Sequence, residues 1–336
     1  MESFFANGTW LPIVFAFLMG LAMLIYAILD GYDLGVGILT PAGTDKEKDT
    51  MIASIGPFWD ANETWLVLGV GILLVAFPMA HGVILTNLYL PVALMLVGLI
   101  LRGVAFDFRA KAHVEHKEYW DAAFFLGSLI TALAQGHMLG SYILGFSKTY
   151  EAALFSTFVG FCVAGGYALI GSSWLIMKAE GELQRKAIRW SRISLWVTAF
   201  GILVVSATTP LVSTRIFDKW FSWPEFLFLL PIPLLSGALI LFLDRVLAQL
   251  PKPNDRHCWV PFAVTVVIFL LCFLGLAYSF FPYIVPQQMT IFEAASAPES
   301  LMIILVGALL VLPVLIGYTI FAYRVFWGKA GSLNYH

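Results

Sequence analysis

The sequence predicts an all-α membrane protein that crosses the bilayer many times, and three observations lead to this fold class. Apolar residues make up 60% of the 336 residues, and charged residues make up only 12%. Ordinary soluble domains are about 25% charged. Uncharged stretches of roughly 20 residues, the length that spans a bilayer as a helix, recur from end to end. We therefore expect a single integral membrane domain over residues 1–336.

Nine stretches meet the length requirement for a transmembrane helix. No basic residue precedes the first of them, so we expect it to remain as a span and not to be a cleaved secretory signal. The first two look longer than a bilayer requires, which predicts tilted or projecting inner ends. The nine predicted spans are 11–38, 56–80, 84–104, 121–143, 154–177, 191–210, 225–243, 259–283 and 301–323.

The basic residues predict the orientation. Sixteen of the 19 lysines and arginines fall in alternate loops and the C-terminal tail, all on one side of the predicted spans. The other side holds only Lys148, Arg215 and Lys219. Loops rich in Lys and Arg stay in the cytoplasm. The N-terminus is then outside and the C-terminus inside, which requires an odd number of spans and agrees with nine.

Composition also excludes some functions. A net charge of −2 offers no basic surface for nucleic acid, and the three cysteines lack the spacing of a metal site or a disulfide.

Small residues recur at helical spacing in two pairs, Gly31 with Gly35 and Gly136 with Gly140. Such pairs allow helix backbones to approach closely, so we interpret them as packing positions.

Two pairs of carboxylates lie near the predicted cytoplasmic ends of the first two spans. Asp30 and Asp33 are three residues apart, as are Asp60 and Glu63, so each pair shares one side of its helix. An ionised carboxylate in hydrocarbon costs roughly 3 kcal/mol or more. We therefore expect these groups to face a partner, water or a proton path.

Arg102 and Asp107 lie at the cytoplasmic end of the third predicted span, so the ionisable groups of three consecutive spans gather on one side of the membrane. One interpretation is that they are interfacial charges and helix caps, with Arg102 neutralising an aspartate. We favour this interpretation for Asp30, Asp33 and Asp107 taken singly.

The other interpretation is a hydrated proton inlet that opens to the cytoplasm. We favour it for Asp60, which we expect to lie deepest in aromatic and otherwise apolar surroundings. Glu63, one helical turn further on, is the next candidate carrier. Trp59 and Asn62, which flank Asp60, are assigned structural roles.

The sequence does not predict a cofactor site within this chain. His137, in QGHMLG, is the one histidine inside a predicted span, and together with Met138 it is a candidate axial haem ligand. A lone histidine is more often a hydrogen-bonded polar residue of the helix. Paired-histidine arrays, haem-attachment motifs and phosphate loops are absent from the sequence. We therefore expect no metal or haem held by this chain alone.

Five motifs carry a family resemblance. In chain order they are DGYDLGVGIL, GPFWDANETWLVLGVG, LRGVAFDFRAK, QGHMLGSYILGF and FPYIVP. They resemble subunit II of the cytochrome bd-type ubiquinol oxidases, and the short loops are more similar to the cyanide-insensitive branch. The resemblance covers essentially the whole chain.

The resemblance implies a terminal respiratory oxidase. Such an enzyme oxidises quinol on the outer side, reduces dioxygen to water, takes protons from the cytoplasm and is thereby electrogenic without pumping. The site of action is a bacterial cytoplasmic membrane, or a thylakoid membrane for a cyanobacterial source.

The resemblance also implies how the complex is divided between its subunits. Two b-type haems and one d-type haem, or a b-type in its place, belong to subunit I. Subunit II binds no haem, has two four-helix bundles plus one peripheral helix, and pairs with subunit I as a pseudosymmetric heterodimer. A short single-helix accessory subunit, a structural ubiquinone and lipid are further expected partners.

The family's proton-path aspartate follows a tryptophan in the second span, and Asp60 after Trp59 matches it. The enterobacterial pattern has a histidine before that tryptophan, where this chain has Phe58. Glu63 replaces an uncharged family residue. Our hypothesis is that Glu63 restores a proton carrier that the change at Phe58 removes.

Two alternatives stay open from the sequence. A secondary transporter or channel would also combine many spans with intramembrane carboxylates, although transporters often carry inverted repeats and midplane sites. A purely structural scaffold would cover the haem subunit without conducting protons.

Overall fold

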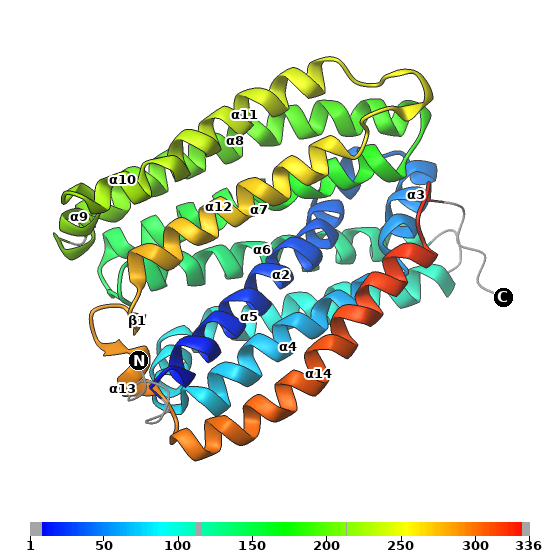
Figure 1. Cartoon of the computed structure of the whole chain (residues 1–336). Coiled ribbons are helices and arrows are strands. Elements are labelled where there is room, and N and C mark those ends of the chain that lie inside the picture. The colour runs from blue at the N-terminus through cyan, green and yellow to red at the C-terminus, as the bar shows by residue number, and fades with distance from the viewer. Residues whose placement is uncertain (1–8, 112–115, 213, 331–336) are drawn as a thin grey trace.

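The computed structural model describes residues 9–111, 116–212 and 214–330, and the structure is 85% helical. Within these ranges nine helices are long and apolar enough to span a membrane, which confirms the predicted fold class (Figure 1). They are α2 (Leu11–Leu39), α4 (Trp59–Ala76), α5 (Pro78–Lys111), α6 (Lys117–Ile143), α7 (Tyr150–Lys178), α8 (Gly181–Val212), α11 (Pro231–Ala248), α12 (Val260–Phe280) and α14 (Pro298–Val325).

Short elements close the two ends of the bundle (Figure 1). The end that carries the C-terminus holds η1 (Thr40–Ala42), α3 (Asp45–Ile55) and η3 (Pro253–Asp255). The opposite end holds α9 (Thr214–Phe221), α10 (Glu225–Leu229), α13 (Ile291–Ala294) and the strands β1 (Tyr283–Val285) and β2 (Met289–Thr290). The two strands pair antiparallel, with Tyr283 opposite Thr290 and Val285 opposite Met289.

Prolines correct three of the predicted boundaries. The predicted spans 56–80 and 84–104 become α4, which ends at Ala76, and α5, which begins at Pro78. The predicted span 225–243 divides into α10 and α11, and α11 begins at Pro231. Proline lacks an N–H and has a fixed φ, so it fits the first turn of a helix better than the interior. The prediction that the second span is longer than a bilayer requires is wrong, because α4 has 18 residues.

The backbones of α2 and α7 touch at the centre of the bundle. A Cβ atom on Gly35 would overlap the carbonyl oxygen of Tyr167, and one on Gly171 would lie 2.5 Å from the carbonyl carbon of Gly35. The same holds between α6 and α7, where a Cβ on Gly136 would lie 2.6 Å from the Cα of Gly160. The interpretation of the glycine pairs as packing positions is confirmed.

Helix α14 lies at the edge of the bundle, beside α4 (Figure 1). Only 6% of its most apolar window is buried within the chain. Its C-terminal end is held by the Tyr323 ring, which stacks on Phe58 with centroids 4.5 Å apart, and by Lys178, which donates to the Phe326 carbonyl at 2.8 Å. α14 is thus the least buried of the nine membrane-spanning helices within the described residues. The grouping of the other eight into two bundles stays a prediction, because α7 packs against α2 and α6 as well as α8 and α12.

Helix α3 is fixed at the end of the bundle by a capping box. Thr44 and Glu47 satisfy each other's backbone N–H groups, and Lys186 of α8 donates to Glu47 at 2.7 Å. Burial raises the pKa of Glu47, but the hydrogen bonds from Lys186 and Thr44 outweigh it and hold this pKa below its usual value. The contact joins α3 to α8.

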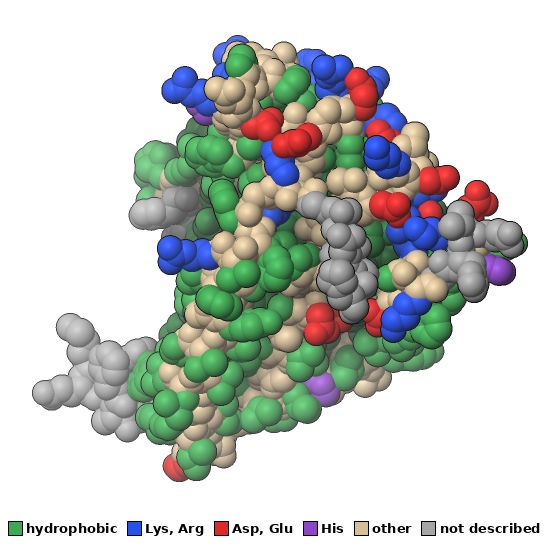
Figure 2. Space-filling view, turned by 90° about the vertical axis from the view of Figure 1, so that its right-hand side faces the viewer, with side chains coloured by type: hydrophobic (Ala, Val, Ile, Leu, Met, Phe, Trp, Pro, Cys, Tyr) green, Lys and Arg blue, Asp and Glu red, His purple; other side chains and the backbone are tan. Residues whose placement is uncertain are grey.

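Charged side chains gather on the end of the molecule that carries α3 and the C-terminus. Figure 2 looks onto this end and shows Lys, Arg, Asp and Glu side chains spread over it, while the visible flanks are mostly hydrophobic. This is the end that the loop charges predict to be cytoplasmic, and the orientation itself stays a prediction.

The contact between α2 and α7 can be tested by adding one methyl group. Gly35→Ala should force the two helices apart and lower the free energy of unfolding by about 1–3 kcal/mol, the usual cost of overpacking. Gly307→Ala in α14 is the matched control, because a Cβ there meets nothing within 4 Å. Thermal denaturation of the purified complex measures both, and equal melting temperatures would contradict the close contact.

Candidate functional site

Arg102 of α5 is the centre of a buried ion cluster. Its side chain is 1% exposed, and its Nη2 lies 2.7 Å from Oδ1 of Asp30 on α2. The same Nη2 also donates to Oε1 of Glu63 on α4. The interpretation of Arg102 as neutralising an aspartate is confirmed. The structure adds Glu63 as a second partner, so one guanidinium connects three membrane-spanning helices.

Asp33 lies one helical turn from Asp30 and is fully buried, but within the described residues no cation contacts it. Its Oδ2 accepts a hydrogen bond from Asn62 Nδ2 at 2.8 Å. Asn62 also donates to the Tyr32 hydroxyl at 2.9 Å and accepts from the Tyr323 hydroxyl at 3.3 Å. Asn62 thus connects α2, α4 and α14 by hydrogen bonds, and its structural role stays a prediction. Asp33 is held in surroundings of neutral amide and hydroxyl groups.

A second polar network lies one turn from Asp30 in the other direction along α2. Gln135 of α6 donates to the Tyr26 hydroxyl at 2.6 Å, and the Tyr167 hydroxyl of α7 donates to the Gln135 carbonyl oxygen at 2.6 Å. Sequence reasoning missed these three residues. The available signal was Gln135 itself, which is a polar amide beside Gly136 in the middle of a predicted span.

Several polar atoms of the cluster lack a hydrogen-bond partner among the described residues. They are Oδ2 of Asp30, Oδ1 of Asp33, and Nε and Nη1 of Arg102, while Oδ1 of Asp30 has its partner in the ion pair with Arg102. Leaving such a group unsatisfied costs about 1–3 kcal/mol, and buried polar groups normally bind protein atoms or water. A group of this size is polar enough to hold water molecules between the helices.

The cluster contains more acid than base. Asp30 and Glu63 contact the single guanidinium of Arg102, Asp33 lies one helical turn from Asp30, and no further cation contacts these carboxylates within the described residues. Excess negative charge at this depth is costly, and a bound proton removes it. The arrangement is therefore chemically suited to bind and release protons.

The structure corrects the prediction for Asp60. Its side chain is exposed at the first turn of α4, whereas Asp30 and Asp33 are 0% exposed. Asp60 is therefore not the deepest acid. The expectation failed because the rotation of α4 turns Asp60 towards the outer surface of the chain and Asn62 towards α2.

Asp107 is also exposed and has no ion-pair partner within the described ranges, so its interpretation as an interfacial charge stays a prediction. Arg109, two residues further on, makes the ion pairs of this part of α5. Its Nε donates to Asp121 of α6, and its Nη1 lies 2.7 Å from Asp49 of α3. The sequence analysis missed this second cluster, which lies nearer the end of the bundle.

Trp59 and Phe58 contribute aromatic contacts on two sides of the start of α4. The Trp59 ring lies 5.9 Å from Arg102 Cζ and 5.1 Å from the Phe106 ring, and its structural role stays a prediction. Phe58 is buried against Trp174 at 5.6 Å, and the Lys178 ammonium lies 5.5 Å from its ring. Phe58 thus belongs to the aromatic group that holds α14.

His137 is half-buried and lies apart from the ion cluster. Its Nδ1 is 3.5 Å from the Thr157 hydroxyl, and it lines a small cavity of about 180 Å³ with Asn87, Ser141 and Lys148. Among the described residues, no group of three or more His, Cys, Asp or Glu side chains is placed to hold a metal ion.

The fold and the site define a class of protein before any comparison. A bundle of membrane-spanning helices with a buried, acid-rich ion cluster is typical of membrane proteins that move protons or ions. The chain matches, over residues 11–326, the family model described as cytochrome bd terminal oxidase subunit II, and it belongs to that family.

Individual relatives cover the chain almost end to end. It is 28% identical over 320 residues to a cytochrome bd ubiquinol oxidase subunit 2 of Bacillus subtilis, which covers 90% of this chain and 91% of the relative. It is 25% identical over 358 residues to the cytochrome bd-I ubiquinol oxidase subunit 2 of Escherichia coli K12, with 93% of each covered.

A solved structure shows the same fold. The bd oxidase from Geobacillus thermodenitrificans contains a chain that matches with a TM-score of 0.78 at 17% identity, covering 94% of this chain and 98% of that chain. The resemblance found in the sequence motifs is therefore confirmed. The chain is subunit II of a bacterial membrane oxidase, and subunit I is its partner in that family.

Removing the central guanidinium should be costly. Arg102→Gln leaves Asp30 and Glu63 buried without their cation, and breaking a buried pair costs about 3–5 kcal/mol. Arg185→Gln is the matched control: Arg185 pairs with Glu182 on the surface at 2.7 Å, and such pairs contribute about 1 kcal/mol or less.

The measurement is the melting temperature of the purified complex, with haem content recorded as a second signal. Adding Asp30→Asn to the Arg102→Gln variant should restore part of the loss, since it removes one orphaned charge. Equal melting temperatures of the Arg102→Gln and Arg185→Gln complexes would contradict the central role of Arg102.

Proposed function

We propose that this chain is the haem-free subunit II of a quinol-oxidising, dioxygen-reducing complex, and that it carries protons from the cytoplasmic side towards the haem-bearing subunit I. The observation that carries the proposal is the Arg102 cluster, where two carboxylates contact one guanidinium and a third, Asp33, is buried one helical turn away. Dioxygen reduction consumes protons, so a proton-exchanging cluster in the partner subunit has a clear use.

Exposure orders the carboxylates along a path. Asp60 is exposed on α4, the Glu63 side chain is 29% exposed, and that of Asp30 is 0% exposed. The Arg102 guanidinium connects the last two. We infer that Asp60 marks the mouth of the path, that Glu63 is the first partly buried carrier, and that Asp30 and Asp33 form its inner end.

The flank of α4 and α5 is the inferred contact with subunit I. Beyond Asp60, this flank exposes large apolar side chains, among them Val67 on α4 and Val97, Ile100 and Val104 on α5. An exposed carboxylate at the edge of an apolar membrane surface needs water or a polar partner. A subunit that covers this flank would place Asp60 at the junction of the two chains.

The remaining assignments follow from the family. We propose that two b-type haems and one d-type haem, or a b-type in its place, belong to subunit I and carry out the reduction of dioxygen. The N-terminus lies outside and the C-terminus in the cytoplasm. A structural ubiquinone, bound lipid and a short accessory helix complete the proposed complex, and charge separation comes from taking protons on the inner side.

Neutral substitutions of the path acids test the proposal. Glu63→Gln and Asp60→Asn keep the shape of the side chain but remove the titrating group, and general acid–base groups contribute about 100-fold or more to rates. We expect each to slow dioxygen consumption with quinol by at least about tenfold, with unchanged haem content. Asp107→Asn is the control, because this exposed acid has no ion pair within the described residues.

Turnover and membrane potential should both be measured in proteoliposomes. If both path variants keep full turnover and potential with intact haems, the path is overturned and the chain is a scaffold for subunit I. That result would leave the family assignment unaffected.

A bound proton can be detected without turnover. We expect Asp33 to hold a proton at neutral pH, because it is fully buried and is contacted by the Asn62 amide and not by a cation. Infrared difference spectra of the purified complex should show the C=O stretch of a protonated carboxylic acid, and Asp33→Asn should abolish it. Asp60→Asn should leave that band in place. A band that survives in the Asp33→Asn complex would assign the proton to another residue.

A further inference from the structure

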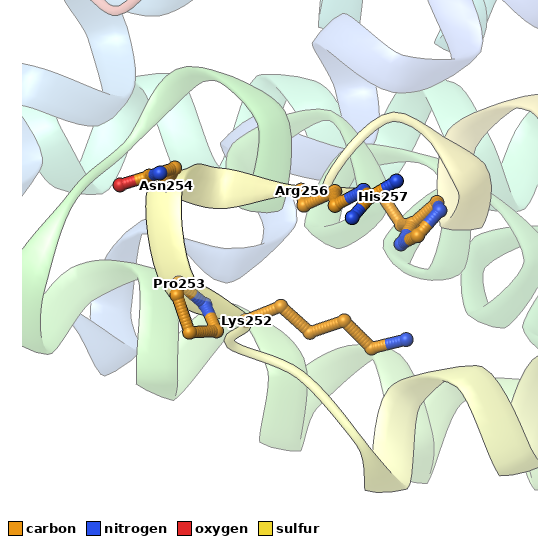
Figure 3. A pocket seen from close by; sticks show the side chains of 5 residues that line it. All are labelled: Lys252, Pro253, Asn254, Arg256 and His257. Carbon is orange, nitrogen blue, oxygen red and sulfur yellow. The ribbon is translucent and has the colours of Figure 1, made fainter.

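We propose that the loop between α11 and α12 (residues 249–259) binds the phosphate of an anionic phospholipid headgroup. The loop borders an open cavity of about 470 Å³ (Figure 3). The cavity is lined by Lys252, Pro253, Asn254, Arg256 and His257. Three of these five side chains are basic, and none is acidic.

The basic side chains are arranged around one opening. Figure 3 shows Lys252 on one side of the cavity and Arg256 and His257 on the other, with all three side chains extending the same way from the loop. The backbone of His257 has a φ of 70°, in the left-handed region, directly after the extended Arg256. The loop thus directs its basic groups towards a shared space.

These basic groups have no acidic partner within the part of the chain that the structure describes. The nearest acid in sequence, Asp255, is already engaged: Lys329 lies 2.8 Å from its Oδ2, and Gln184 donates to its Oδ1 at 2.8 Å. Both partners come from other segments, one from the C-terminal region and one from α8. The single carboxylate of the loop is therefore committed to holding the loop in place, and the cationic charge around the cavity stays uncompensated.

The position of the cavity identifies the source of the phosphate. It lies between the end of α11 at Ala248 and the start of α12 at Val260, at the end of the bundle where charged residues gather. Trp259 beside it is 54% exposed, as is usual for residues at the lipid headgroup level. Basic pockets between membrane-spanning helices on the cytoplasmic side are suited to anionic headgroups, and phosphate accepts charge-assisted hydrogen bonds from Lys and Arg. A membrane lipid is the phosphate carrier that is always present at this level.

Lipid binding to the purified complex tests the site. Native mass spectrometry would measure retention of phosphatidylglycerol and of phosphatidylcholine, with inorganic phosphate added as a competitor. We expect preferential retention of phosphatidylglycerol. The double variant Lys252→Gln, Arg256→Gln should weaken it about 25-fold, since each basic residue near a membrane surface contributes about fivefold.

Arg185→Gln is the control, because Arg185 lies on the same end of the molecule and is paired with Glu182. It should leave retention unchanged, and the charge-preserving Lys252→Arg should keep most of the affinity. Haem content shows that each variant has assembled. Equal retention of the two lipids, an unchanged affinity in the double variant, or displacement of the lipid by inorganic phosphate at similar concentration would each overturn the proposal.

Discussion

The bundle depends on one interaction, the contact of the Arg102 guanidinium with carboxylates from two other helices. A guanidinium that is 1% exposed inside a membrane has no alternative partner of comparable strength, so α2, α4 and α5 are held at a common level by Asp30, Glu63 and Arg102. The short length of α4 contributes to this geometry. The helix has 18 residues and begins at Trp59, so its first turn already lies at the depth of Arg102 and brings Glu63 to the guanidinium.

The rigid and the accessible parts of the site lie on different helices. Asp30 and Asp33 are carried by α2, whose backbone touches α7 at Gly35 and Gly171 and cannot shift without separating the two helices. Gln135 reinforces this contact by linking a phenol of α2 to one of α7. Glu63 is carried by α4, and its side chain is partly exposed. The two buried acids, Asp30 and Asp33, are therefore held rigidly, whereas Glu63 lies partly at the surface of the bundle. This arrangement suits proton transfer from the surface of the bundle to its interior.

The sequence was sufficient for features that depend on one helix at a time. Nine spans followed from the lengths of apolar stretches, and proline shifted only their ends, as at Pro78 and Pro231. Counting residues along each span predicted that Arg102 and the acids lie at a similar level. The burial of each acid could not be predicted, because α4 is apolar around most of its circumference and its apolar pattern does not fix the rotation of the helix. The Gln135 network and the Arg109 pairs were missed because each needs the relative positions of three segments.

Under the proposed function, the surroundings of Phe58 favour a proton route through Glu63. The enterobacterial relatives are expected to have a titratable histidine at this position, beside the tryptophan that precedes the path aspartate. Here the Phe58 ring is stacked on Tyr323 at 4.5 Å and lies edge-on to Phe326 at 5.9 Å, so it faces the end of α14 and not the Arg102 cluster. The Lys178 ammonium beside it donates to the Phe326 carbonyl, which ties α7 to the end of α14 on that side. A closed aromatic group disfavours passage of a proton there. Glu63 has the opposite surroundings, since it is partly exposed and bound to Arg102, and under the proposed function it connects the surface to the buried acids.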